Sequence, residues 1–399
     1  MMDSTGLLLI INAGSSSIKF AIFNAGEPPS AASLLCEGQM SGIGHAILFH
    51  VSGAQLQMQT DVHLPEGCDH AAALDVLLRW IKQTYANQHI VAAGHRIVHG
   101  GDKYQQPVRI DAAVLDELRR LIPLAPLHQP HHIAAITALQ NLFPDLLQIA
   151  CFDTAFHHTN ASVATSYALP QEFTDEGIRR YGFHGLSYEY IAGVMPSVMG
   201  NLLAQGRVVV AHLGSGASMC AILNGVSVAS TMGFTALDGL PMSRRCGTLD
   251  PGVVLYLMQE KKMSADQVAH FLYNDCGLQG VSGISDDVRV LLASDDPRAT
   301  AAIDLFAYRI SRELGSLAAA LGGLDALIFT AGIGENAAVV RNKVGVLSAW
   351  LGVRINETIA SGQHAVCLSA ADATVATWVI PTNEDLMIAQ HTHRLFLSR

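Results

Sequence analysis

The sequence contains one short unit twice, and this repeat constrains the fold more than any other feature. Residues 7–23 read LLLIINAGSSSIKFAIF, and residues 208–223 read VVVAHLGSGASMCAIL. Each unit is an apolar run, a break of glycine and serine, and a second apolar run, which predicts a β-hairpin. An offset of 200 positions sets Gly14 opposite Gly214 and Ala21 opposite Ala221. We therefore predict two related halves, each with one such hairpin.

The turn of each predicted hairpin has the composition of an anion site. Small residues let the backbone approach a ligand closely, and successive N–H groups beside serine hydroxyls form a nest that suits phosphate. For a single copy, an ordinary hairpin would be the favoured interpretation. Because there are two copies, we favour two domains that bring their turns to one shared nucleotide cleft.

Length and charge narrow the class of protein. The chain has 399 residues, two to three times the length of a typical domain, and half of them are hydrophobic. It has 24 basic and 34 acidic residues and no run rich in Lys or Arg, which argues against nucleic-acid or anionic-membrane partners. The amino terminus lacks a signal-peptide pattern, and no apolar run approaches the roughly 20 residues of a membrane helix. We expect a cytoplasmic protein.

Cysteines and histidines give little sign of a metal centre. The seven cysteines are scattered singly without a C-x-x-C pair, which fits reduced thiols better than a zinc site or a disulfide framework. Histidines cluster in LHQPHH (His128, His131 and His132) and in FHH (His157 and His158). Adjacent histidines on one segment rarely point at one ion, so we favour a solvent-exposed position for them over a metal site.

Apolar spacing and turn residues predict an α/β alternation along the chain. In the first half we expect a helix near Asp69, a strand over 89–94 that leads into a polar loop HRIVHGGDKY, a helix over 111–122 and a strand over 147–152. We place a domain boundary at Asp153. In the second half we expect helices from about Ser187 and over 252–259, 264–273 and 298–321, a strand over 324–330, and a last helix from Thr382 with Asp385 in capping-box register.

A glycine pattern near the carboxyl end permits a different interpretation. Residues 332–337 satisfy G-x-G-x-x-A between a strand and a helix, and Glu357 follows about 20 residues later, so a dehydrogenase that binds NAD(H) is one hypothesis. Fewer than 70 residues follow the pattern, too few for a full dinucleotide-binding half. We prefer a glycine turn against an adenine or ribose. The sequence has neither a G-x-x-x-x-G-K-[ST] loop nor the protein-kinase signature set.

A series of rare strings runs through the chain in a fixed order: NAGSSSIKF, GHRIVHGG, LAPLH, FDTAFH, RRYGFHG, HLGSGAS, SGISDDVR, AGIGEN and TNED. On these strings the chain resembles, over nearly its full length, the acetate kinases (acetate and propionate kinases) of the actin-like, sugar-kinase-like ATPase superfamily. The resemblance implies reversible phosphoryl transfer from ATP to a short-chain carboxylate, giving an acyl phosphate and ADP, with Mg²⁺ or in its place Mn²⁺.

The resemblance also implies an architecture. It is an α/β fold of two duplicated ribonuclease-H-like (actin-like ATPase) domains with a central nucleotide cleft, in a homodimer. The first domain would cover residues 1–152 and be joined by a carboxyl-terminal helix over about 384–399. The second, nucleotide-binding domain would cover residues 153–383.

Site residues follow from the resemblance by position. The first hairpin would meet phosphate through Asn12, Ser16 and Lys19, and the second through His212, Leu213, Gly214, Ser215 and Gly216. Arg96 and Arg245 would flank the acyl carboxylate and the transferring phosphoryl group, to which His184 would donate. Asp153, Glu384 and Asn12 would hold Mg²⁺ directly or through water. The acyl pocket would comprise Val98, Leu127, Phe183 and Ala236, and the nucleoside would lie against Asp287, Val288, Arg289, Gly332, Ile333, Gly334 and Asn336.

The chemistry of this reaction fits those residue types. A carboxylate is already ionised at pH 7, so the nucleophile needs no general base, and the enzyme must only position two anions against their repulsion. Guanidinium groups, a divalent ion on oxygen ligands and backbone nests are suited to that task. The chain departs from the family pattern at Ser215, Gln129, Leu186, Tyr188, Ser243, Arg244 and Thr248. A non-kinase ATPase of the same superfamily, without a paired-arginine acyl pocket, stays an alternative.

Overall fold

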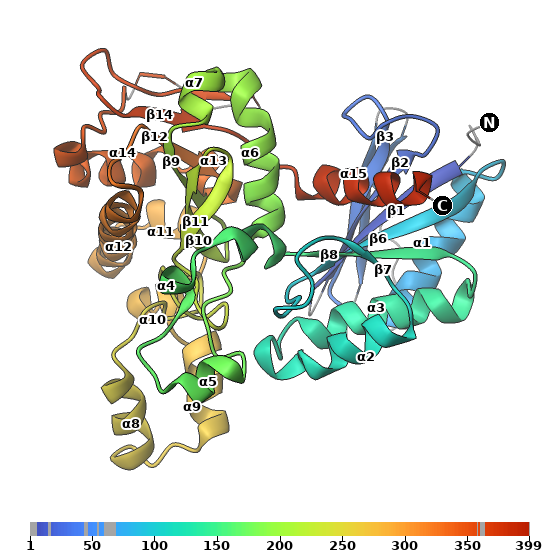
Figure 1. The fold of residues 1–399 in the computed structure, drawn as a ribbon, viewed down its shortest axis with the longest axis horizontal. Helices are drawn as coiled ribbons and strands as arrows, with labels where there is room; N and C mark the ends of the chain where they lie inside the picture. Colours follow the sequence, from blue (N-terminus) through green and yellow to red (C-terminus); the bar gives the residue numbers. More distant parts are fainter. Residues whose placement is uncertain are drawn as a thin grey trace. The chain divides into compact units, whose positions relative to one another are not determined.

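The computed structural model describes residues 6–14, 17–43, 47–53, 56–59, 69–356, 358–359 and 364–398 (Figure 1). Two notable residues, Ser16 and Glu357, lie outside this described part. The chain divides into two compact units. Unit 1 comprises Met1–Ala155 and Asn383–Arg399, and unit 2 comprises Phe156–Thr382. None of the helices in the described part is long and apolar enough to cross a membrane.

Unit 1 is built on an eight-stranded sheet in the order β5-β4-β3-β2-β1-β6-β8-β7. Its strands are β1 (Gly6–Ala13), β2 (Ser17–Asn24), β3 (Leu34–Ser41), β4 (Leu48–Gly53), β5 (Leu56–Gln59), β6 (His89–Ile97), β7 (Val108–Arg109) and β8 (Leu147–Phe152). Its helices are α1 (His70–Thr84), α2 (Ala112–Arg120), α3 (Gln129–Leu142) and α15 (Glu384–Leu397), with a 3-10 turn at Ile122–Leu124.

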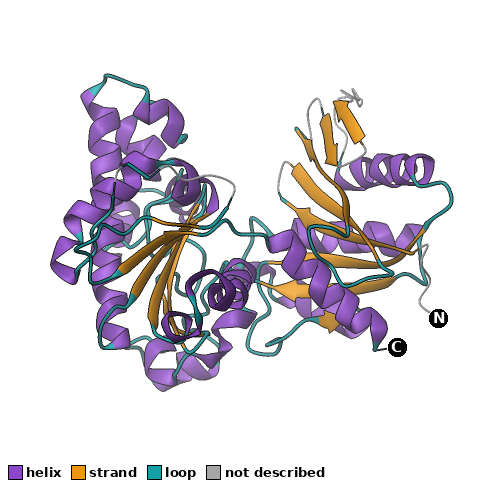
Figure 2. Cartoon of the chain, turned by 90° about the horizontal axis from the view of Figure 1, so that it is seen from above, coloured by secondary structure: helices purple, strands orange, loops and turns teal. Residues whose placement is uncertain are grey.

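Unit 2 is built on a six-stranded sheet in the order β11-β10-β9-β12-β14-β13. The strands are β9 (Arg207–Leu213), β10 (Ala217–Leu223), β11 (Val226–Ser230), β12 (Ala326–Thr330), β13 (Val366–Cys367) and β14 (Ala376–Val379). The helices are α4 (Ser162–Thr165), α5 (Gln171–Asp175), α6 (Gly185–Met199), α7 (Asn201–Ala204), α8 (Pro251–Gln259), α9 (Ala265–Asn274), α10 (Gly277–Ser282), α11 (Val288–Leu292), α12 (Pro297–Leu321), α13 (Ala331–Asn336) and α14 (Ala338–Leu347). Helices α6 and α12 both pack on β9. Figure 2 shows helices in purple around the strands in orange.

The two sheets share six strands in the same order and with the same directions. In unit 1, β2 pairs antiparallel with both β3 and β1, β6 is parallel to both β1 and β8, and β7 closes the edge antiparallel to β8. In unit 2, the strands β11, β10, β9, β12, β14 and β13 repeat these pairings. The predicted hairpins are β1–β2 and β9–β10. The prediction of a duplicated α/β fold is thereby confirmed.

The central strands of both sheets are apolar because helices cover them. Leu7 to Ile11 of β1 and Val208 to Ala211 of β9 are almost fully buried, as expected for strands next to parallel neighbours. Helix α15 at the end of the chain packs against β1 and β6. Gly94 allows this approach, because a Cβ atom there would collide with the Thr392 and Ile388 side chains.

Several local predictions were wrong. The predicted polar loop over 95–104 begins three residues later than expected, at Val98, because β6 continues to Ile97 beside β8. The expected glycine turn over 332–337 is the short helix α13. The last helix begins at Glu384 with Asn383 as its N-cap, whose side chain accepts a hydrogen bond from the Leu386 N–H, so the capping box with Asp385 does not form.

The expectation of exposed histidines was also wrong for two of them. His132 and His157 are buried, and burial lowers the pKa of His157 to about 4 and that of His132 well below its usual value. Both therefore fold as neutral rings that can accept and donate hydrogen bonds. His158 is exposed as expected. Among the described residues, no group of three or more His, Cys, Asp and Glu side chains could hold a metal ion.

Candidate active site

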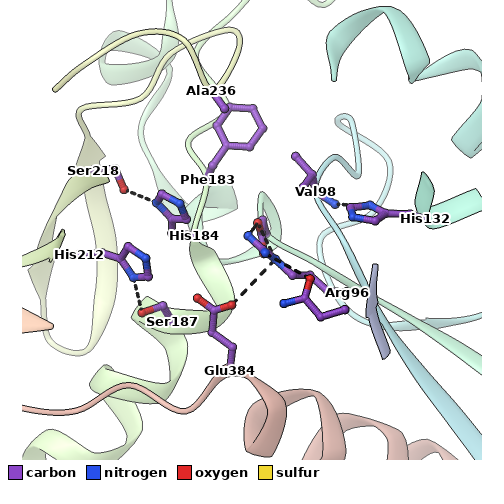
Figure 3. Close-up of polar contacts among 12 residues, drawn as sticks. Arg96, Val98, His132, Phe183, His184, Ser187, His212, Ser218, Ala236 and Glu384 are labelled. Atoms are coloured by element: carbon purple, nitrogen blue, oxygen red, sulfur yellow. Dashed lines mark hydrogen bonds and ion pairs between the residues drawn. The ribbon is translucent and has the colours of Figure 1, made fainter. Parts of the chain in front are cut away.

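In unit 1, three strand ends bring polar side chains to one edge of the sheet. Asn12 lies near the end of β1, Arg96 near the end of β6, and Asp153 directly after β8. Because β1, β6 and β8 are parallel, their carboxyl ends meet at the same edge, which is where ligands bind in open α/β sheets. Glu384, the first residue of α15, joins this group (Figure 3).

Arg96 is the centre of this group. Its Nη2 lies 2.7 Å from Asp153 Oδ2 and its Nε lies 3.1 Å from Asp153 Oδ1, so the guanidinium binds the carboxylate in a bidentate manner. Arg96 Nη1 donates to Asn12 Oδ1 at 3.4 Å, and Arg96 Nε lies 3.9 Å from Glu384 Oε2. Asp153 is only 1 % exposed. The fork thus holds its carboxylate in a fixed orientation.

The charges at this edge are closely balanced. Burial alone would lower the pKa of Arg96, but the Asp153 and Glu384 carboxylates outweigh it and raise that pKa above its ordinary value. The guanidinium therefore stays charged. Burial, together with the neighbouring Glu384, raises the pKa of Asp385 to about 6. Lys19, paired with Asn12 in the β1–β2 register, adds a second cation to this edge.

Behind this edge, His132 supports the backbone after β6. Its Nδ1 accepts a hydrogen bond from the Val98 N–H at 3.3 Å. Gln129 donates through Nε2 to the His99 carbonyl at 3.1 Å. Val98 is buried, whereas Leu127, the other predicted acyl-pocket residue of unit 1, is 41 % exposed.

In unit 2, the second hairpin turn lies beside two stacked imidazoles. The turn closes with a hydrogen bond from the Gly214 N–H to the Gly216 carbonyl at 3.0 Å. His212, at the end of β9, and His184, the left-handed N-cap of α6, stack with ring centroids 4.2 Å apart. A Cβ atom at Gly216 would lie 3.3 Å from His184 Nε2 and 3.5 Å from Arg245 Nη2. The turn therefore has an imidazole and a guanidinium nitrogen at its surface.

The segment from Met242 to Cys246, here called the arginine loop, is tied to the same turn. The Ser243 N–H donates to the Ser215 carbonyl at 3.2 Å, and Arg245 Nη1 donates to the Ala236 carbonyl at 2.8 Å. Arg244 instead forms an exposed ion pair with Asp286 at 2.8 Å. Of the two adjacent arginines, Arg245 is thus the one directed at the turn.

The predicted nucleoside residues fall into two groups. Asp287 is the N-cap of α11 and pairs with its neighbour Arg289 at 2.6 Å, while Val288 is buried. Gly332, Ile333, Gly334 and Asn336 lie in α13. Leu213 is fully buried, so only its backbone can serve a ligand. Of the first hairpin turn, Gly14 is described and donates to the Ser17 carbonyl at 2.7 Å.

Comparison with known proteins gives a consistent result. Residues 7–390 match the model of the Acetokinase family. The chain is 58 % identical over 390 residues to an acetate kinase of Rhodopseudomonas palustris, covering 98 % of each chain. A propionate kinase structure from Francisella tularensis superposes with a TM-score of 0.88 at 34 % identity, covering 98 % of this chain and 99 % of that one. An acetate kinase structure from Porphyromonas gingivalis superposes with a TM-score of 0.85 at 33 % sequence identity, covering 98 % of this chain and 100 % of that one.

The chain belongs to the acetokinase family. The resemblance read from the motif series is thereby confirmed, and with it the prediction of a kinase. The dehydrogenase hypothesis is wrong, since the glycine pattern on which it depended lies in a chain of this family.

Two buried side chains that shape this acetokinase site were not predicted. His157 Nε2 donates to the Phe183 carbonyl at 3.0 Å, while its Nδ1 lies 2.8 Å from Ser227 Oγ, so it fixes the backbone just before His184. Arg341 donates to the carbonyls of Gly334 and Glu335 and so fixes the end of α13. The string FDTAFH did signal His157, but spacing alone did not indicate its contact with residue 183.

Oxygen donors in unit 1 suit a magnesium ion. Asp153 and Glu384 supply carboxylates and Asn12 supplies an amide oxygen, all around Arg96. Mg²⁺ prefers such hard oxygen ligands and is usually bound by one or two carboxylates together with water and substrate phosphates. The donor set of this edge therefore fits that ion, whereas no histidine or thiol cluster typical of zinc is found among the described residues.

Proposed function

We propose that the protein catalyses reversible, Mg²⁺-dependent phosphoryl transfer from ATP to acetate, and also to propionate, forming an acyl phosphate and ADP. The observation that carries the proposal is the convergence of Arg245 Nη2 and His184 Nε2 on the Gly214–Gly216 turn. A nest of backbone N–H groups with a guanidinium and an imidazole is suited to a phosphoryl group. We assign the nucleotide to unit 2 and place the enzyme in the cytoplasm.

In this mechanism the acyl carboxylate attacks the γ-phosphorus in line, and no protein base is required. Arg96, held by Asp153, binds the carboxylate and offsets the repulsion between the two anions. Arg245 and His184 donate to the phosphoryl oxygens, whose charge they stabilise during transfer. Asn12, Lys19 and the turn of the first hairpin contact phosphate.

Asp153, Glu384 and Asn12 would hold the magnesium ion directly or through water. When bound, the ion neutralises charge on the phosphate oxygens. Arg96 competes for the same carboxylate oxygens of Asp153, so contact through water is the arrangement that best fits a carboxylate already bound by a guanidinium. Glu384, which lies 3.9 Å from Arg96, is less engaged with that guanidinium than Asp153 is.

A series of carboxylates tests the substrate assignment. One buried CH₂ contributes about 0.8 kcal/mol, and hydrophobic pockets discriminate a methylene by roughly 10- to 200-fold. With Val98, Leu127, Phe183 and Ala236 as pocket residues, we expect acetate and propionate to react and butyrate to be poor. Trapping the acyl phosphate with hydroxylamine measures this directly. Fastest turnover with butyrate would contradict the assignment, and no acyl phosphate from any carboxylate would contradict the function.

The adjacent arginines provide a matched pair of variants. If Arg245 stabilises the phosphoryl group, Arg245→Ala should lose roughly 10³- to 10⁵-fold in rate, and Arg245→Lys should recover little because a point charge lacks the bidentate fork. Arg244→Ala should be mild, because Arg244 forms an exposed ion pair with Asp286. Steady-state rates measure both. A severe Arg244→Ala defect beside a mild Arg245→Ala defect would reverse the assignment.

Variants of the adjacent residues Glu384 and Asn383 distinguish the role of a metal ligand from that of a helix cap. Asn383 caps α15 through Leu386, so Asn383→Ala should lower stability by about 1 kcal/mol and leave the Mg²⁺ dependence unchanged. Glu384→Ala should raise the Mg²⁺ concentration needed for half-maximal rate with little change in thermal stability. Magnesium titrations and thermal unfolding of both variants provide the comparison. A normal magnesium response of Glu384→Ala would remove Glu384 from the metal site.

We also propose that two copies of the chain associate through α8. This helix, of sequence PGVVLYLMQ, has no buried residue and no charge, and Leu255 and Tyr256 are 54 % and 51 % exposed. Exposed apolar patches of this kind mark protein interfaces. Leu255→Glu should convert a dimer to a monomer in light scattering. Leu202→Glu on α7, where the side chain is 92 % exposed, is the control and should stay dimeric. A monomeric parent protein would contradict the homodimer.

A further inference from the structure

The two stacked imidazoles of unit 2 each face a serine hydroxyl. His184 Nδ1 lies 2.8 Å from Ser218 Oγ, and His212 Nδ1 lies 2.8 Å from Ser187 Oγ (Figure 3). The opposite nitrogens lie toward the turn, since Cβ atoms at Gly216 and Gly214 would be 3.3 Å from His184 Nε2 and 3.8 Å from His212 Nε2. Each ring thus presents Nδ1 to a hydroxyl and Nε2 to the turn.

A second hydroxyl continues the chain of hydrogen bonds behind His184. Tyr188 Oη lies 2.5 Å from Ser218 Oγ, and both side chains are fully buried. A phenol, with a pKa near 10, is a more acidic donor than an aliphatic alcohol, which favours donation from the Tyr188 O–H to Ser218 Oγ. The single proton of the Ser218 hydroxyl is then available to His184 Nδ1. A ring that accepts at Nδ1 carries its proton on Nε2.

We propose that Tyr188 and Ser218 are positioning residues that hold His184 in the neutral, Nε2-protonated tautomer, with that N–H directed at the Gly214–Gly216 turn. The role of this donor in phosphoryl transfer depends on the function proposed above. If the His184 ring were also protonated on Nδ1, its positive charge would lie beside the Arg245 guanidinium at the same turn, and the two cations would repel each other. A neutral donor keeps its proton and still binds an anionic oxygen.

Local secondary structure accounts for this arrangement. His184 is the N-cap of α6, and the Tyr188 N–H donates to the His184 carbonyl at 3.1 Å, so the two side chains are one helical turn apart on the same face. Ser218 lies on β10 directly opposite His212 on β9. The stack of the two rings therefore places His184 above the strand that carries its serine partner. The register of helix α6 and the register of strands β9 and β10 together fix the hydrogen-bonded chain of Tyr188, Ser218 and His184.

Nitrogen-15 NMR of histidine-labelled protein tests the tautomer without any assumption about the substrate. The His184 signals are assigned by their loss in His184→Asn. We expect the wild-type ring to show a protonated Nε2 and an unprotonated Nδ1 at neutral pH, and Ser218→Ala to shift the ring toward a mixture of tautomers. A wild-type His184 that is protonated on Nδ1, or on both nitrogens, would overturn the proposal.

Kinetics test whether the two hydroxyls act as one chain. A hydrogen bond contributes about 0.5–1.5 kcal/mol, so we expect Tyr188→Phe and Ser218→Ala each to lower kcat about 2- to 10-fold with little change in KM for ATP. Because both act through the same proton, the double variant should be no slower than Ser218→Ala alone. Ser230→Ala on β11 is the control, since that buried hydroxyl has no hydrogen-bond partner in the described part of the chain.

The outcomes separate this proposal from the proposed function. If the losses in kcat of Tyr188→Phe and Ser218→Ala multiply in the double variant, the two side chains have independent packing roles, and the proposed hydrogen-bonded chain is overturned. An unchanged kcat in both single variants would also overturn it. Absence of acyl phosphate from the wild-type enzyme would contradict the proposed function, while the NMR result would still decide the tautomer of His184.

Discussion

The central strand of each sheet imposes the constraint on which the site depends. Strands β1 and β9 each pair antiparallel with a hairpin partner on one side and parallel with a neighbour on the other. The antiparallel side produces a tight turn, and the parallel side aligns carboxyl ends at the same edge. A hairpin turn and polar side chains from separate strands therefore meet at one edge in each unit.

The two units use that edge in different ways. In unit 1 it carries Asn12, Arg96 and Asp153, a charged cluster in which one guanidinium binds a buried carboxylate. In unit 2 it carries the Gly214–Gly216 turn, with the imidazoles of His184 and His212 and the guanidinium of Arg245. A duplicated backbone thus supplies the same geometry twice, with different side chains at the two edges: a guanidinium bound to a carboxylate in unit 1, and two stacked imidazoles beside a guanidinium in unit 2.

Sequence reasoning succeeded where local signals agree with the tertiary fold. The strand over 147–152 matches β8, and the apolar spacing after Pro297 matches α12. It failed where a distant group decides the local structure. At AGIGEN the short helix α13 forms, and its Glu335 Oε1 accepts a hydrogen bond from the distant Thr382 N–H at 3.2 Å as well as from the Ala331 N–H. Glycine spacing alone contains no information about that contact.

The same limit explains which site residues sequence reasoning missed. The motif series led to His184 and Arg96 through family resemblance, because matching strings identify equivalent positions even where the physical role of a residue is unknown. The series contains Ser218, the last residue of HLGSGAS, but it did not indicate the contact of Ser218 with His184 or the hydrogen bonds of His157 and His132, because these contacts join segments tens of residues apart. Such partners are visible only when strand register is known.

A protein with a net negative charge that binds two anions depends on positively charged and hydrogen-bonding groups placed locally at the site. The formal net charge is −10, so long-range attraction does not favour ATP or a carboxylate. Binding must instead come from short-range donors already in place. Arg96 is held by Asp153, and Arg245 by the Ala236 carbonyl, so neither side chain is ordered only when substrate arrives. Since the cost of ordering a long side chain is met on folding, a carboxylate or phosphate that binds these forks loses less free energy to reorganisation.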